Sequence, residues 1–233
     1  MDNLKIIFEL STPMVTTGYP IHLDALLAYA ATQRELPYLE NHNQEELDLI
    51  YSELPIEKYE KDGDWVFKAS ALMPEGSAYH SSQFYTRRTD EMDLAVKASK
   101  GIIQVGKMKH GEDLKPHAMK LDMVRGSQRN LLGYYSTTDV DKVVAYCVGD
   151  KDLIEEILID YGFISHLGKR RRTGHGNIKS INIEVDESTE KMWMHRMKPW
   201  KLLDNDVAIK AVTKAPYWDK SKTCQAYCPS SLA

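Results

Sequence analysis

The distribution of apolar residues predicts strands and helices near both ends of the chain, with an irregular stretch between them. Two segments repeat apolar residues at helical spacing, namely 21–31 and 151–161. Asp150 is suited to cap the second helix, and Gly162 is suited to end it. Strands are expected at 4–10, 65–72, 131–137, 142–148 and 177–185. This order predicts an α+β fold, and a ferredoxin-like (RRM-like) βαββαβ domain is the simplest architecture.

Three further segments interrupt or follow this pattern within an expected single domain over 1–233. Residues 35–64 are acidic, and we expect a solvated excursion with a short helix at 44–52. Residues 74–130 contain many glycines and cations. We expect an inserted, thumb-like hairpin there, since long irregular segments in compact domains are usually functional or disordered. Residues 202–233 are expected to form a C-terminal tail.

The composition is typical of a globular chain, with 42% hydrophobic and 27% charged residues among 233. No apolar run approaches the roughly 20 residues that span a bilayer. The first residues lack the basic and apolar regions of a signal peptide. Three cysteines are too few for a disulfide framework and fit a reducing compartment. We therefore expect a cytoplasmic protein without a membrane partner.

Charge is divided unevenly along the chain, although the overall net charge is only −4. Residues 1–66 hold 4 Lys or Arg and 13 Asp or Glu, which gives −9, whereas residues 67–233 hold 26 and 21, which gives +5. A positive face is therefore possible, and with it an anionic partner. The simpler interpretation is two differently charged solvated surfaces.

The segment 168–176, with the sequence GKRRRTGHG, carries the most specific chemistry. Gly168, Gly174 and Gly176 permit backbone angles and close approaches that other residues resist. Four consecutive cations lie between these glycines, namely Lys169, Arg170, Arg171 and Arg172. Such a loop can offer N–H groups and guanidinium groups to phosphates together. It has neither the order of a Walker loop nor that of a dinucleotide fingerprint. A solvated basic turn is the alternative.

This glycine-rich basic loop resembles the signature loop of the RAMP superfamily, the RNA-binding subunits of CRISPR effector complexes. The segment 20–29 (PIHLDALLAY) resembles the first-helix segment of several of these proteins. The segment 70–88 (SALMPEGSAYHSSQFYTRR) resembles the region that leads into their thumb. Together the segments are most similar to the subunit of the type IV effector that binds the 5′ handle of the guide RNA.

The resemblance implies a non-catalytic subunit that binds and caps the handle of the guide RNA. The three glycines would shape the loop, its cations and His175 would meet RNA, and Arg87 and Arg88 would lie at the base of the thumb. Four further cations could line the thumb, namely Lys107, Lys109, Arg125 and Arg129. The implied partners are the guide RNA and other effector subunits, including the backbone and large subunits. Target DNA would be met only through the complex.

Two other hypotheses stay open. The first is a metal-independent endoribonuclease of the same superfamily that processes the guide-RNA precursor. Histidine suits proton transfer near neutral pH, so His175 and His80 are its candidates for acid–base roles. The second is a protein–protein scaffold that uses the Met- and Trp-rich segment 191–201. No cofactor or metal is expected, because Cys224 and Cys228 lack a second ligand pair.

Overall fold

The computed structural model describes residues 1–16, 18–39, 44–88, 90–102, 107–110, 113–116 and 129–232. Contacts divide the chain into two units, which are described separately. Unit 1 comprises Met1–Ser81 and Ser136–Ala233, and unit 2 comprises Ser82–Tyr135. The inserted region was expected at 74–130.

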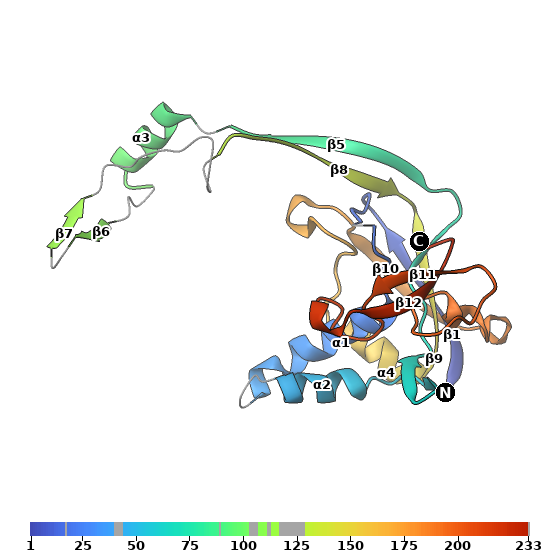
Figure 1. Cartoon of the computed structure of the whole chain (residues 1–233). Helices are drawn as coiled ribbons and strands as arrows, with labels where there is room; N and C mark the ends of the chain where they lie inside the picture. The colour runs from blue at the N-terminus through green and yellow to red at the C-terminus, as the bar shows by residue number, and fades with distance from the viewer. Residues whose placement is uncertain are drawn as a thin grey trace. The chain divides into compact units, whose positions relative to one another are not determined.

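Unit 1 is built on a four-stranded sheet with the order β10-β1-β9-β4 (Figure 1). Its strands are β1 (Asp2–Leu10), β4 (Met73–Glu75), β9 (Lys142–Gly149) and β10 (Ile178–Val185), and all neighbours are antiparallel. Leu4, Ile6 and Phe8 of β1 have no exposed surface, because alternate residues of a strand share one face. Ile6 pairs with Ala145 and Ile183, which extends the core across three strands. The molecule is therefore a mixed α/β protein with antiparallel sheets.

The two predicted core helices are present. The first is α1 (Leu23–Glu35), and the second is α4 (Lys151–Glu155), which continues as a π-helical turn over Glu156–Asp160. Asp150 caps α4 by accepting a hydrogen bond from the Leu153 N–H at 3.1 Å, which confirms the predicted cap. Leu27 and Leu158 join the same hydrophobic core as the sheet residues.

The acidic segment holds more structure than the sequence indicated. The short helix predicted at 44–52 is α2 (Gln44–Ser52). It is followed by a hairpin of β2 (Lys58–Lys61) and β3 (Asp64–Phe67), which was not predicted. The strand expected at 65–72 is wrong beyond Phe67. The Ala69 N–H donates back to the Phe67 carbonyl at 2.8 Å, so the chain leaves the ladder at that point.

The C-terminal segment is not a free tail. Strands β11 (Asp206–Ala211) and β12 (Cys224–Pro229) form an antiparallel hairpin. Ala211, Ala226 and Cys228 are buried in its own small core. These small residues give a weak hydrophobic pattern, which is why the sequence alone did not indicate strands here.

Unit 2 consists of the distal parts of a long two-stranded ribbon and a short helical segment. The ribbon pairs β5 (Tyr79–Arg87) with β8 (Leu131–Asp139), and both strands begin or end in unit 1. The remaining described elements are α3 (Glu91–Ser99), β6 (Lys107–His110) and β7 (Asp113–Pro116). Across the residues that the structure describes, no helix is long and apolar enough to cross a membrane.

Candidate nucleic-acid interface

The glycine-rich segment 168–176, here called the glycine loop, lies between the helical segment that ends at Asp160 and β10. Backbone hydrogen bonds fasten both its ends to the chain that follows β1. The Lys169 N–H donates to the Val15 carbonyl at 2.8 Å, and the Gly176 N–H donates to the Pro13 carbonyl at 2.9 Å. The base of the loop is therefore held by the segment that connects β1 to the first helix.

Its glycines are required for two different reasons. A Cβ on Gly168 would lie 2.4 Å from the Val15 carbonyl oxygen, and a Cβ on Gly176 would lie 1.9 Å from that of Leu167. Both distances are far below van der Waals contact, so these positions need glycine for close packing, and their φ angles of +79° and +68° favour glycine as well. Gly174 has open space around it but a φ of +81°, so it needs glycine for its left-handed backbone.

The cations of the loop project from this fixed base. Residues Arg171–Thr173 form a 3₁₀ turn, and the side chains of Lys169, Arg171 and Arg172 are exposed. None of these three has a salt bridge with any residue in the described part of the chain. Arg170 precedes the turn in a left-handed conformation with φ 62°. The exposed cations retain full capacity for an anionic ligand.

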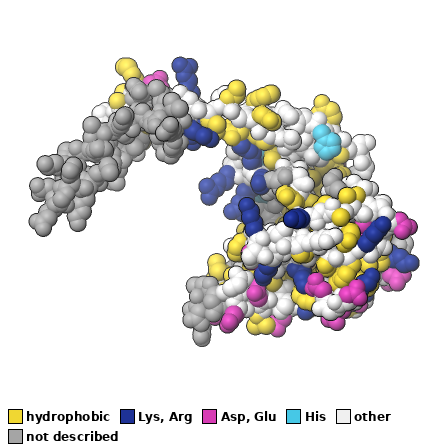
Figure 2. Space-filling view, in the orientation of Figure 1, with side chains coloured by type: hydrophobic (Ala, Val, Ile, Leu, Met, Phe, Trp, Pro, Cys, Tyr) yellow, Lys and Arg dark blue, Asp and Glu magenta, His cyan; other side chains and the backbone are white. Residues whose placement is uncertain are grey.

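Figure 2 shows how charge is distributed over one face. Lys and Arg side chains gather over the part of unit 1 that carries the glycine loop in Figure 1. Asp and Glu side chains lie over the part that carries the acidic N-terminal segment. Lys and Arg side chains also lie among these carboxylates, so the charges of the sequence are separated only in part on this face.

The two candidate histidines occupy different environments. His175 is only 8% exposed, and its Nδ1 lies 3.3 Å from the Pro13 carbonyl oxygen. His80 is exposed on β5, and its Nδ1 lies 3.2 Å from the Thr138 hydroxyl. His175 therefore contributes to anchoring the glycine loop.

The thumb candidates belong to unit 2. Arg87 ends β5 and donates from Nε and Nη2 to the Arg129 carbonyl at 3.2 and 3.1 Å. Arg88 follows and is exposed. Lys107 and Lys109 lie in β6, and Arg125 lies outside the described residues.

A buried charged cluster was missed by sequence reasoning. Arg196 and Asp24 have no exposed side-chain surface, and Arg196 Nη2 lies 3.2 Å from Asp24 Oδ2. The Tyr217 hydroxyl donates to the same carboxylate at 2.8 Å and accepts from Arg196 at 2.7 Å. Arg196 Nη1 also donates to the carbonyls of Phe67 and Ala69. The one available signal was an aspartate next to the apolar stripe of a predicted helix.

His22 completes this cluster. Its ring stacks on Tyr217 with centroids 4.7 Å apart, and its Nε2 accepts from the Met197 N–H at 3.0 Å. Burial, followed by the nearby Arg196 charge, lowers the pKa of His22 well below its usual value. Burial likewise raises the pKa of Tyr217 well above its usual value. The neutral imidazole and phenol tie α1 to the C-terminal segment.

The segment 191–201 is mostly interior. Trp193 and Met197 are 4% exposed, and Lys198 is fully buried in an ion pair with Asp206 at 2.8 Å. These residues therefore pack within unit 1, whereas Met192, Met194 and Trp200 of the patch that the sequence suggested are half-buried.

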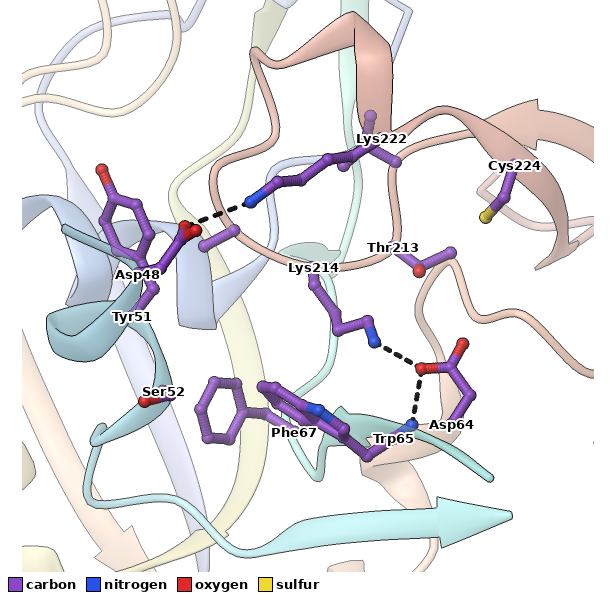
Figure 3. A pocket seen from close by; sticks show the side chains of 12 residues that line it. Asp48, Tyr51, Ser52, Asp64, Trp65, Phe67, Thr213, Lys214, Lys222 and Cys224 are labelled. Atoms are coloured by element: carbon purple, nitrogen blue, oxygen red, sulfur yellow. Dashed lines mark hydrogen bonds and ion pairs between the residues drawn. The ribbon is translucent and has the colours of Figure 1, made fainter. Parts of the chain in front are cut away.

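A first hollow lies between α2 and residues 212–224, with a volume of about 430 Å³, and is called the α2 pocket (Figure 3). Two lysines point into it, and each meets a carboxylate. Lys222 pairs with Asp48 at 3.1 Å, and Lys214 pairs with Asp64. Burial raises the pKa of Asp64, but hydrogen bonds from Lys214 and the Trp65 N–H outweigh it and lower that pKa overall. The cations of this pocket are already neutralised.

A second hollow lies between α1 and residues 210–223, with a volume of about 990 Å³, and is called the α1 groove. Its cationic lining consists of Lys169, Lys210 and Lys220. Its aromatic lining includes Tyr19, Tyr29 and Trp218. Since Lys169 also belongs to the glycine loop, the two features adjoin. Nothing in the sequence indicated this groove.

No group of three or more His, Cys, Asp or Glu side chains suited to a metal ion occurs within the described ranges. Cys147 is buried, which raises its thiol pKa to about 12. Cys228 is buried in the C-terminal hairpin, and Cys224 is exposed.

Comparison with known protein families supplies a match that covers nearly the whole chain. Residues 2–229 match the model of a family described as CRISPR type IV associated protein Csf3. No curated protein matches the chain.

Proposed function

The chain belongs to the family of CRISPR type IV associated protein Csf3, and from this premise we propose that it is an RNA-binding subunit of a type IV CRISPR effector. In this role it binds and caps the 5′ handle of the guide RNA and does not cleave it. Its partners are the guide RNA and the other subunits of the complex, and target DNA is reached only through that complex. The family match extends over residues 2–229, so the premise concerns nearly the whole chain.

The glycine loop carries this proposal. Its base is fixed by backbone hydrogen bonds to Pro13 and Val15, so its conformation is set before any ligand arrives. Lys169, Arg171 and Arg172 stand exposed on that base without a carboxylate partner among the described residues. Preorganised, unneutralised cations are what phosphate recognition needs, and phosphate contacts dominate affinity for nucleic acids.

The strand order supports a ferredoxin-like interpretation of unit 1. Taken in chain order, β1, α1, β4, β9, α4 and β10 follow the βαββαβ sequence, and the sheet order β10-β1-β9-β4 is the one such a unit adopts. The β5–β8 ribbon enters between its second and third strands, where a thumb is expected.

Binding is favoured over cleavage by the state of the loop histidine. His175 is 8% exposed and faces a backbone carbonyl, so it is poorly placed to exchange protons with an RNA backbone. His80 is exposed and keeps the nuclease alternative testable.

One experiment separates these functions. The purified protein is mixed with its cognate repeat RNA in EDTA, and the same sample is run on native and denaturing gels. We expect a shifted, intact RNA. The double variant Arg171→Ala/Arg172→Ala should bind more weakly and lower the salt slope by about 0.7 for each phosphate that the protein no longer neutralises.

The control for that variant is Lys191→Ala/Lys201→Ala, which removes two exposed cations elsewhere in unit 1. It should leave the salt slope nearly unchanged. A cut RNA that becomes intact on His80→Ala or His175→Ala would establish the nuclease instead. Absence of binding at low salt, or equal effects of the two double variants, would contradict the proposed role of the loop.

A further inference from the structure

The α1 groove is distinguished first by its charge. Lys169, Lys210 and Lys220 line it, and no aspartate or glutamate occurs among the described residues of its lining. In the described part of the chain none of these ammonium groups forms a salt bridge. Unpartnered cations that converge on a hollow of about 990 Å³ favour an anionic occupant.

Its second feature is an exposed aromatic wall. Trp218 is 71% exposed and Tyr19 is 65% exposed, although large aromatic rings normally lose most of their surface on folding. Trp218 is nevertheless held in place, because its neighbour Tyr217 is bonded to Asp24 and Arg196 beneath the groove. On its other side, Asp219 caps the following turn by accepting from the Ser221 N–H.

The groove also adjoins the glycine loop. Lys169 lies in both, and its backbone is bonded to Val15 at the base of the loop. An RNA backbone that contacts Arg171 and Arg172 is therefore followed by further cations, beginning with Lys169, on its way into the groove. The combination of a flat apolar surface with nearby cations matches a nucleotide, whose base stacks while its phosphate pairs.

We propose that the α1 groove is a binding site for one unpaired nucleotide of the guide RNA. Its base lies against Trp218, and its phosphate is contacted by Lys169, Lys210 and Lys220. This inference rests on the proposed function, since it names the part of the RNA that continues beyond the glycine loop. The groove thereby gives the protein a contact that double-stranded RNA cannot make, because a paired base is not free to enter it.

The test uses the full chain and its cognate repeat RNA, either intact or with a single abasic nucleotide at each handle position. Affinity is measured by fluorescence anisotropy. The wild type should lose about five- to a hundredfold in affinity at one abasic position, since base–aromatic stacking is worth about 1–3 kcal/mol. Trp218→Ala should lose a similar factor in affinity for intact RNA. An abasic nucleotide at that position should then weaken its binding no further. Trp218→Phe should restore most of both.

Two matched controls accompany these variants. Tyr38 is 79% exposed but lies outside the groove, so Tyr38→Ala should bind as the wild type does. Lys220 and Lys222 belong to the same short turn, Lys220–Lys222, but among the described residues a carboxylate is paired with Lys222 and none with Lys220. Lys220→Gln should reduce the salt slope by about 0.7, whereas Lys222→Gln should not.

The outcomes separate the two proposals. Unchanged affinity and an unchanged abasic profile in Trp218→Ala would overturn the nucleotide site. If Arg171→Ala/Arg172→Ala still weakened binding, the proposed function would stand without it, and the groove would have to serve a protein neighbour. A wild type that binds no repeat RNA would overturn both. Should Trp218→Ala fail to fold, Lys220→Gln against Lys222→Gln decides the question.

Discussion

The α1 groove and the α2 pocket lie on two sides of residues 212–215 and are lined by similar residues. They differ in whether their lysines are paired with carboxylates. Both include Tyr51, Val212 and Ala215 in their linings. Both also contain lysines and aromatic rings. In the α2 pocket, each lysine is paired with a carboxylate (Figure 3), whereas the three lysines of the α1 groove have no such partner among the described residues. The lack of such partners is our reason for proposing an anionic ligand in the α1 groove.

The acidic segment of the chain explains the difference. Asp48 lies on α2 and Asp64 begins β3, and these two residues neutralise Lys222 and Lys214. The negative charge at the start of the chain thus acts locally on one side of the C-terminal segment. On the other side, the lysines of the α1 groove have no salt bridge to a described residue.

The largest expected effect is a loss of stability when the buried ion pair between Arg196 and Asp24 is removed. Arg196→Met leaves the Asp24 carboxylate buried without its charged partner, which typically costs about 3–5 kcal/mol. The measurement is the free energy of unfolding from urea denaturation. Replacing both partners, as Asp24→Leu with Arg196→Met, should recover part of the loss. A single variant within about 1 kcal/mol of the wild type would contradict the anchoring role.

A smaller effect should follow from disturbing the loop that places Lys169 beside the groove. Gly174→Ala should cost about 1–2 kcal/mol, since only its left-handed backbone opposes a side chain. Gly176→Ala should cost clearly more, because its Cβ would also overlap the Leu167 carbonyl. Thermal denaturation of both variants measures this difference. Equal losses would show that close packing at Gly176 is unimportant.

His22, which lines the α1 groove, should make the free energy of unfolding depend on pH. His22 has a depressed pKa in the folded protein, whereas the unfolded chain takes up that proton near pH 6.5. The stabilising contribution is therefore complete above pH 6.5 and declines as the pH falls below it. We expect the urea concentration at the unfolding midpoint to decrease as the pH is lowered from about 7.5 to about 5.5. The decrease should be smaller in His22→Gln. An identical pH dependence in the two proteins would contradict this assignment.

The smallest expected effect is a difference in thermal stability between a lysine variant of the α2 pocket and one of the α1 groove, measured without any ligand. Lys222→Gln removes a partly exposed ion pair with Asp48 and should cost less than about 1 kcal/mol. Lys220→Gln removes no ion pair and should leave the melting temperature unchanged or raise it slightly by relieving repulsion. Melting curves at low ionic strength compare the two. A larger loss in Lys220→Gln would mean that its charge is paired.

The elements that sequence periodicity predicted are those with a strong local pattern. β1 alternates Leu4, Ile6 and Phe8, and the cap at Asp150 is a local hydrogen bond, so both could be read from neighbouring residues. β2 and the β11–β12 hairpin were missed because their apolar positions are few or are occupied by small residues, whereas Trp65, Val66 and Phe67 of β3 lie within the strand predicted at 65–72.

Much of the site depends on contacts that no local pattern contains. The glycine loop was visible because its glycines and cations are consecutive. The α1 groove combines residues from 19–33, Lys169 and 210–223, which meet only in the folded chain. Likewise, Asp24 and Arg196 lie 172 positions apart, and only their pairing makes burial of either charge tolerable.

We propose that RNA binds on the glycine-loop side of the C-terminal segment and not on the α2 side. Hydrogen–deuterium exchange of the protein with and without its repeat RNA tests this most directly. We expect slower exchange at 168–176 and 216–222, with no change at 44–52 or 58–67. Protection confined to the α2 side, with none in the glycine loop or along the α1 groove, would contradict it.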